Sequence, residues 1–234
     1  MVLRAMPQFG RTKVLKAAAL ISSDHLGRAI APFFSFITMT LLNDKQIAKL
    51  AENDIFLPFV GEKRRELDNG TKAISFGLSQ AGYDIRLSSV EFLVFDQLPF
   101  ETDEKVIDAK NFNLKPEVAK LHEQEDGSAY FMLPSLSYGV GTSLELISMP
   151  NDVFALCEGK STYGRCGLIA NILPIEPGWA GYLTMCLVNP TGFPIKLYAN
   201  EGIAQLVLFG IDEVGEAYTG AYQNQGARVQ LAAV

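Results

Sequence analysis

Histidine and cysteine, the side chains that most often bind zinc, are scarce in this sequence. Among 234 residues there are two histidines, His25 and His122, and three cysteines, Cys157, Cys166 and Cys186. No Cys-x-x-Cys, His-x-Glu or Pro-Cys-x-x-Cys motif occurs, so neither a protein-bound zinc ion nor a zinc-dependent deaminase site is expected. An odd number of cysteines without close pairs also argues against a disulfide framework, and it predicts a reducing, cytoplasmic location.

An excess of positive charge is also lacking, because the formal net charge is −6. This balance does not favour nucleic-acid binding. Residues 1–38 are the exception, with five basic residues and one acidic residue, and we predict a basic N-terminal extension or arm there, with Met39 as an alternative start. The apolar run at residues 14–21 is interrupted by Lys16 and is far too short to span a bilayer, so no membrane association is predicted.

The composition is that of a chain with a substantial core, since 48% of the residues are hydrophobic and 15 are phenylalanine. From Ala129 onward, short apolar segments are separated by Gly, Pro and Asn at intervals of about 8–12 residues, which is typical of antiparallel β architectures. The sequence therefore predicts a mainly β fold, a barrel or jelly roll, with a few short helices. The predicted strands cover residues 129–134, 143–150, 152–159, 167–175, 181–189, 194–200 and 203–210.

Two helices are expected outside this series. Asn43 or Asp44 can cap a helix whose apolar face carries Ile47, Leu50 and Ala51. Residues 98–128 are charged and poorly periodic, and are predicted to form a long loop with a short helix near 116–122 and a surface-exposed histidine at its end. We predict that residues 39–215 form the β domain and that residues 216–234 form a mobile C-terminal tail that closes over the site.

A candidate phosphate-binding turn lies at residues 159–165, GKSTYGR. Glycine permits close approach of the backbone, Lys160 supplies a cation, Ser161 and Thr162 supply hydroxyl donors, and the Arg165 guanidinium is suited to phosphate oxygens. The first glycine of a Walker A loop is missing, so that motif is excluded. The same residues are equally compatible with a strand-to-helix cap that carries a surface lysine and arginine.

Three motifs follow one another along the chain: ISFGLSQAGYDIRL at 74–87, GKSTYGRCGLIANILPIEPGWAGYLTM at 159–185 and NEGIAQLVLF at 200–209. Together, and in this order, they resemble the dCTP deaminase branch of the dUTPase superfamily. The resemblance extends over about residues 39–226. It implies a dUTPase-like distorted jelly-roll or β-barrel, and a homotrimer whose active sites are shared between subunits.

The resemblance also implies roles for individual residues. Lys160, Ser161, Thr162 and Arg165 match positions that contact the triphosphate and the active-site water, with contributions from a neighbouring subunit. Ser161 and Arg165 are thereby candidate catalytic residues.

The remaining matches concern the nucleoside. Ile172, Leu173 and Pro174 match the segment that recognises the pyrimidine edge, and Glu176 matches the acidic residue that holds the 3′-hydroxyl of the deoxyribose. In the tail, Tyr222 and Gln225 match a Lys-Tyr-x-x-Gln motif that folds over the nucleotide. Leu173 and Ala221 depart from the family's pattern, which has threonine and lysine at these positions.

The most important departure is Cys186. The family has a glutamate here that serves as the general acid and base of deamination, whereas this chain reads Thr184-Met185-Cys186-Leu187. A cysteine can act as a base only if its pKa is lowered, and its neighbours Met185 and Leu187 offer no cation. The alternative is that Cys186 is a small buried core residue without a catalytic role.

Three functions are therefore open at the level of sequence. The family reaction converts dCTP and water to dUTP and ammonia, with Mg²⁺ bound through the triphosphate rather than in a protein cage. The second possibility is a dUTP or dCTP diphosphatase in which Glu176 positions water. The third is a catalytically inactive trimer that binds nucleotides or serves assembly.

Overall fold

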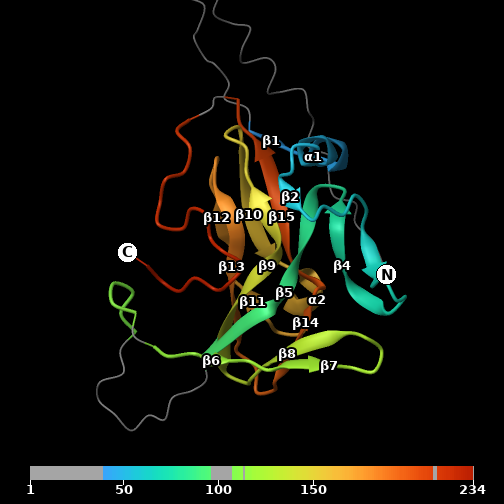
Figure 1. The fold of residues 1–234 in the computed structure, drawn as a ribbon, viewed down its shortest axis with the longest axis vertical. Helices are drawn as coiled ribbons and strands as arrows, with labels where there is room; N and C mark the ends of the chain where they lie inside the picture. Colours follow the sequence, from blue (N-terminus) through green and yellow to red (C-terminus); the bar gives the residue numbers. More distant parts are fainter. Residues whose placement is uncertain (1–38, 96–106, 113, 213–214, 234) are drawn as a thin grey trace, which may run out of the picture. The chain divides into compact units, whose positions relative to one another are not determined.

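The computed structural model describes residues 39–95, 107–112, 114–212 and 215–233 (Figure 1). The predicted basic arm at 1–38 lies outside the described residues, so it stays a prediction.

Strands dominate the described residues, and only two helices occur among them. The helices are α1 (Asp44–Ala51) and α2 (Ser161–Gly164). The strands are β1 (Thr40–Leu41), β2 (Phe56–Leu57), β3 (Arg64–Glu66), β4 (Lys72–Ser79), β5 (Gly82–Phe95), β6 (Glu117–Val118), β7 (Leu121–Glu123), β8 (Ala129–Leu133), β9 (Ser137–Ser148), β10 (Val153–Gly159), β11 (Ile169–Ala170), β12 (Leu173–Ile175), β13 (Ala180–Asn189), β14 (Ile195–Ala199) and β15 (Gly202–Gly210).

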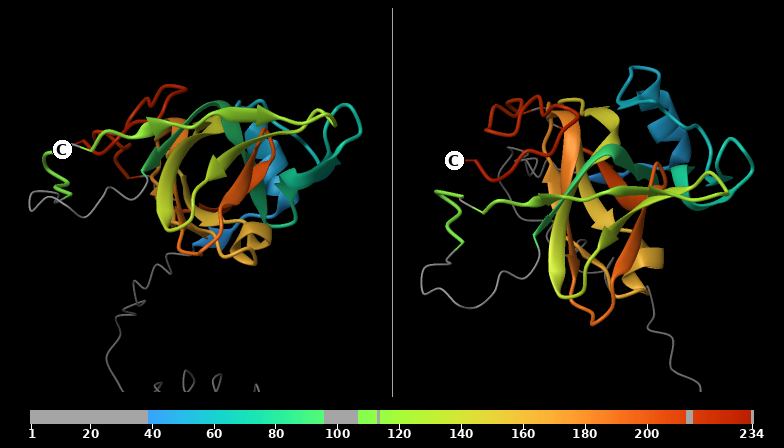
Figure 2. Two further views of the ribbon diagram at one scale, coloured as in Figure 1. Left: turned by 90° about the horizontal axis from the view of Figure 1, so that it is seen from below. Right: turned by 60° about the horizontal axis from the view of Figure 1, so that its bottom comes forward.

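The largest sheet has 12 strands, and its central path runs β11-β13-β9-β5-β15-β10-β12; β14, β8 and β7 form a second, three-stranded sheet. Long β5 pairs with β4 and β15 near its start and with β9 near its end, all antiparallel. The strands curl around the core rather than lying flat (Figure 2). The prediction of a mainly β, barrel-like fold is thus confirmed.

Alternating burial along the strands creates two apolar regions. Most buried side chains belong to one continuous interior core. A smaller outer cluster lies on the opposite face of β5, β9 and β13, where Leu93, Phe95 and Val140 are buried. The partly buried side chains packed on this outer cluster are Phe112, Leu114, Tyr138, Cys186, Val229 and Leu231.

The helix predicted after Asn43 is confirmed as α1. Asn43 accepts a hydrogen bond from the Gln46 backbone N–H at 3.1 Å, and the Gln46 side chain accepts one from the Asn43 backbone N–H at 3.1 Å. This reciprocal capping satisfies two donors that the first turn would otherwise leave unpaired. Ile47 and Ala51 are buried against the core, as their spacing predicts.

The short helix predicted near residues 116–122 was wrong. The chain there forms β6, which pairs with β5, and β7, which pairs with β8. His122 is half-buried rather than fully exposed, and it stacks on Tyr130 with ring centroids 5.1 Å apart. Neighbouring strands supply the hydrogen bonds here, so pairing decides the conformation where local periodicity is weak.

The single strand predicted at 167–175 is divided in two. β11 pairs with β13, whereas β12 crosses to pair with β10. Between them, the Asn171 backbone N–H still donates to the Cys186 carbonyl at 3.2 Å. This crossing carries Leu173 and Pro174 away from α2 and toward the turn that contains Glu176.

Candidate functional site

Strand β13 places Thr184 and Cys186 on one side and Leu183, Met185 and Leu187 on the other. The latter three are buried in the interior core, and the side chains of Thr184 and Cys186 are half-buried on the outer face. Because successive side chains of a strand point to opposite faces, the core residues fix the direction of Cys186.

The turn before β13 presents Glu176 and Trp179. Gly178 has a φ of 76°, a left-handed conformation that suits glycine, and the Trp179 backbone N–H donates to the Glu176 carbonyl at 3.1 Å. The Glu176 side chain is exposed, whereas Trp179 is buried. The turn thus directs the Glu176 carboxylate outward, while the Trp179 indole packs inward.

The C-terminal tail continues this structure by adding hydrogen bonds along β13. The Trp179 indole N–H donates to the Tyr222 carbonyl at 2.7 Å, and the Tyr182 backbone N–H donates to the Gln225 carbonyl at 3.0 Å. The Thr184 hydroxyl donates to the Gln225 side-chain oxygen at 3.1 Å. In Figure 1 the tail is the red segment that runs beside β13.

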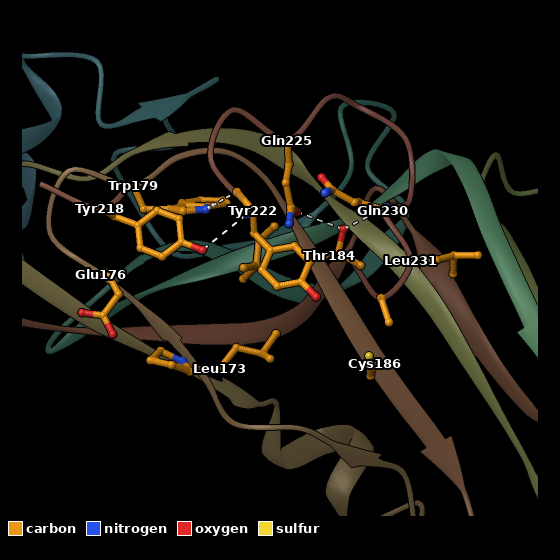
Figure 3. A pocket seen from close by; sticks show the side chains of 13 residues that line it. Leu173, Glu176, Trp179, Thr184, Cys186, Tyr218, Tyr222, Gln225, Gln230 and Leu231 are labelled. Atoms are coloured by element: carbon orange, nitrogen blue, oxygen red, sulfur yellow. Dashed lines mark hydrogen bonds between the residues drawn. The ribbon is translucent and has the colours of Figure 1, made fainter. Parts of the chain in front are cut away.

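These segments enclose a pocket of about 480 Å³ (Figure 3). Its walls come from β12, the Glu176 turn, β13 and the tail. The lining residues are Leu173, Pro174, Glu176, Trp179, Leu183, Thr184, Cys186, Tyr218, Tyr222, Gln225, Gln230, Leu231 and Ala232. A volume of this size, with apolar walls and a few polar groups, is typical of small-molecule sites.

Six of the residues predicted from the sequence line this one pocket: Leu173, Pro174, Glu176, Cys186, Tyr222 and Gln225. The Glu176 carboxylate and the Cys186 sulfur lie toward opposite sides of it in Figure 3. Ile172 is 65% exposed and is not among the lining residues. The pocket thus brings together residues that were predicted to contact the base and the sugar and tail residues that were predicted to cover the nucleotide.

Cys186 has no environment that would make it a base. Burial raises the pKa of its thiol, so the neutral form predominates at neutral pH. Besides lining the pocket, the side chain packs in the outer cluster with Val229 and Leu231 of the tail. At this position β13 presents a neutral thiol that packs on the same apolar cluster as Val229 and Leu231 of the tail.

The other predicted residues lie at α2, and none of the described residues that line the pocket belongs to this helix. Ser161 and Thr162 are exposed, and so is Arg165, which donates to the Ser161 hydroxyl at 3.4 Å. Behind the helix, the buried Tyr163 hydroxyl accepts a hydrogen bond from the Tyr198 backbone N–H at 2.8 Å. The helix is therefore held from within while its polar groups face outward.

Lys160 is not a surface lysine. Its side chain is 8% exposed, and its ammonium lies 2.6 Å from a carboxylate oxygen of Asp84, which is 2% exposed. The Lys63 ammonium lies 3.6 Å from the same oxygen. In the single chain, the Lys160 charge is thus already balanced by Asp84 at the base of α2.

Arg86, two residues after Asp84 on β5, also forms an ion pair inside the fold. Its side-chain Nε and its backbone N–H donate to the two carboxylate oxygens of Glu145, at 2.7 Å and 2.9 Å. Burial raises the pKa of Glu145, and the nearby Arg86 charge opposes this shift. Asp84 and Arg86 of the Gly-Tyr-Asp-Ile-Arg motif therefore form ion pairs inside the fold, and neither residue lines the pocket.

Sequence reasoning missed several lining residues. Alternation along β13 was a sufficient signal for Thr184, because it shares the face of Cys186. Trp179 lies in the motif at 159–185, but its side chain is not titratable, so it was not predicted as a site residue. Gln230 and Leu231 reach the pocket only because the tail folds back, and no local pattern indicates that.

Two further kinds of feature are absent from the described residues. No group of three or more His, Cys, Asp or Glu side chains in this part of the chain is arranged to hold a metal ion. Within the same residues, no helix has the length and apolar character needed to cross a bilayer.

Comparison with known sequences gives a consistent family. Residues 41–211 match the family model described as dCTP deaminase-like. The dCTP deaminase of Laribacter hongkongensis is 39% identical over 191 residues, which cover 81% of this chain and 94% of that protein. The dCTP deaminase of Helicobacter pylori strain P12 is 40% identical over 193 residues, which cover 82% and 94%.

Two solved structures are also similar. The 2′-deoxycytidine 5′-triphosphate deaminase of Agrobacterium tumefaciens aligns with a TM-score of 0.47 at 22% identity, over 78% of this chain and 51% of that chain. The EIAV dUTPase aligns with a TM-score of 0.32 at 22% identity, over 44% and 92%.

Proposed function

The chain belongs to the dCTP deaminase-like family, and we propose that it binds dCTP or dUTP in the pocket beneath its C-terminal tail. The observation that carries this proposal is that one cavity gathers five predicted nucleotide contacts, from β12, the following turn and the tail, together with Cys186 of β13. The base lies against Leu173 and Pro174, the Glu176 carboxylate accepts a hydrogen bond from the deoxyribose hydroxyl, and the Tyr222 and Gln225 side chains cover the ligand.

The triphosphate needs cations that this pocket lacks, because no Lys or Arg occurs among its described lining residues. Arg165 with the Ser161 and Thr162 hydroxyls provides these groups on α2, outside the pocket. We therefore assign the phosphates to α2 of a neighbouring copy in a homotrimer. Mg²⁺ would enter with the triphosphate, whose charge it would partly neutralise.

Deamination of dCTP is the first candidate reaction, and it proceeds slowly in this chain. Attack of water on the pyrimidine requires a group that takes a proton from the water and returns one to the leaving amine. The Cys186 thiol is a poor proton acceptor, because burial raises its pKa and favours the neutral form, and no cation occurs beside it among the described residues that line the pocket. Loss of such general acid–base catalysis costs about 10²- to 10⁴-fold in rate.

A second candidate is hydrolysis of the triphosphate to the monophosphate and pyrophosphate. Glu176 favours it, because this is the only carboxylate among the described residues that line the pocket. An exposed carboxylate can orient a water molecule for attack on a phosphoryl group. This activity leaves the base unchanged, so its products distinguish it from deamination.

The decisive experiment measures binding and products separately. Titration calorimetry with dCTP, dUTP and dATP in the presence of Mg²⁺ tests the proposed ligand class, and chromatography detects dUTP, ammonia and pyrophosphate. We expect binding of a pyrimidine nucleotide and weak or absent ammonia release. Failure to bind either pyrimidine triphosphate contradicts the proposed function.

Substitution of Cys186 tests the missing proton shuttle. We expect Cys186→Glu to raise the deamination rate by about 10²- to 10⁴-fold, whereas Cys186→Ser leaves it unchanged. Because Leu231 lines the same pocket and packs on the same apolar cluster as Cys186, the glutamate is also introduced together with Leu231→Gln, which makes this part of the wall more polar. Wild-type protein that releases ammonia as fast as either glutamate variant contradicts the role assigned to Cys186.

A further inference from the structure

Glu91 on β5 receives the far end of the C-terminal tail. Its carboxylate accepts a hydrogen bond from the Val229 backbone N–H at 2.9 Å and one from the Arg228 guanidinium at 3.1 Å. The Glu91 side chain is 14% exposed, whereas the Arg228 side chain is 78% exposed. Because an exposed ion pair contributes little, the shielded bond to the Val229 N–H is the stronger of the two.

The position of Glu91 follows from the alternation of β5. Glu91, Leu93 and Phe95 lie two residues apart, so their side chains share the outer face of the sheet. Leu93 and Phe95 form the base of the outer cluster, and Val229 and Leu231 pack on it. The same short stretch of tail is thus held by a carboxylate at one end and by apolar contacts next to it.

This anchored stretch is also a wall of the pocket. Gln230 and Leu231, which directly follow Val229, line the cavity together with Cys186. The Gln230 backbone N–H donates to the Thr184 hydroxyl at 3.4 Å, and that hydroxyl donates to Gln225 at 3.1 Å. A change in the position of Val229 therefore shifts the residues that cover the ligand.

We propose that Glu91 is a positioning residue that fixes the C-terminal tail over the pocket through Val229 and Arg228. It does not line the pocket, and it acts through Gln230, Leu231 and Gln225. Its effect on ligand affinity rests on the proposed nucleotide site, whereas its effect on tail docking does not.

Trypsin measures tail docking directly, because Arg228 is the only Lys or Arg that follows Lys196. Cleavage after Arg228 releases residues 229–234, and it requires the Val229 N–H to leave Glu91. In full-length protein without nucleotide, we expect Glu91→Ala to accelerate release of this peptide about tenfold. Glu91→Gln keeps an acceptor without the charge and should accelerate it about threefold.

Asp68→Ala is the matched control. It removes a carboxylate that pairs with Arg64 at 2.8 Å, far along the chain from the tail, and should leave the release rate unchanged. Equal release from wild type and both Glu91 variants overturns the proposal. The Glu91→Gln variant retains the shape of the side chain, so it decides the matter even where Glu91→Ala fails to fold.

A second readout separates positioning from a general structural role. We expect Glu91→Ala to raise the dissociation constant of dCTP about fivefold to tenfold, while the turnover rate of bound nucleotide is unchanged. If wild-type protein binds dCTP and Glu91→Ala binds it equally well, the positioning role is overturned. If wild-type protein binds no nucleotide, the proposed function fails, and the trypsin assay still decides whether Glu91 anchors the tail.

Discussion

The pocket under the tail and the helix α2 hold the two halves of the predicted site, and their side chains differ in kind. The pocket has a cavity of about 480 Å³ with largely apolar walls and no cation among its described lining residues. Helix α2 carries exposed hydroxyls and is followed by the exposed Arg165. Lys160, which precedes the helix, is buried in an ion pair with Asp84. In the proposed function, one region encloses the nucleoside and the other binds its phosphates.

Under the proposed function, this difference makes a single chain an incomplete site. An enclosed cavity disfavours unpaired charges, whereas phosphate recognition requires cations that are open to the ligand. Separating the two functions on different parts of the fold meets both requirements, provided that another copy brings them together. The predictions below test this division, from the largest expected effect to the smallest.

The largest effect is expected behind α2. Asp84→Asn leaves the Lys160 ammonium buried without its closest partner, which typically costs about 3–5 kcal/mol in the free energy of unfolding. Chemical denaturation of the purified variant measures this. The control is Asp68→Asn, which breaks an ion pair of similar length whose carboxylate is 95% exposed and should cost about 0.5 kcal/mol or less. Similar losses in both variants would show that burial of the Asp84–Lys160 pair has no special weight.

The second effect concerns the phosphates. Arg165→Ala should weaken dCTP binding by about 100-fold without lowering stability, because the guanidinium is exposed and makes only a long bond to Ser161. Calorimetric titration against the exposed control Arg65→Ala measures the difference. Unchanged affinity in Arg165→Ala would remove α2 from the site.

Mixing two defective variants sharpens this test. If α2 and the pocket of one site come from different copies, co-assembled Arg165→Ala and Glu176→Ala chains regain about one quarter of the intact sites. If each site is built within one chain, the mixture regains none. Binding stoichiometry after co-refolding distinguishes the two arrangements.

The smallest effect compares the cysteines. Cys166 follows α2 and is exposed, Cys186 is half-buried in the pocket, and Cys157 is buried. Burial raises the pKa of Cys186 and raises that of Cys157 to about 12, so both carry less thiolate at pH 8 than an ordinary cysteine. We expect the alkylation rate to fall about tenfold from Cys166 to Cys186 and again from Cys186 to Cys157. Peptide mass spectrometry measures the rate at each cysteine. As pH rises, alkylation of Cys186 should increase toward its raised pKa, and dCTP should slow it. Early modification of Cys186 would contradict its packing against the tail.

Local signals predicted much of the fold. The capping residue Asn43 and the spacing of Ile47 and Ala51 located α1, and alternation located most strands after Ala129. Where the local pattern was weak, prediction failed, because β6 and β7 exist through pairing with β5 and β8. For the site, motif matching identified six of the residues that line the pocket, but it could not separate them from the predicted residues at α2.

The sequence by itself determined the family, the β architecture and the presence of a thiol rather than a carboxylate at position 186, because these depend on residue identity and short-range order. Only the tertiary structure decided how charges and apolar groups are paired. Lys160 looked like a free cation until Asp84, distant in sequence, was found beside it. Glu91 and Leu231 carried no signal until the tail folded onto β5 and β13. Contacts of this kind are set by long-range packing, which a local pattern of residues does not encode.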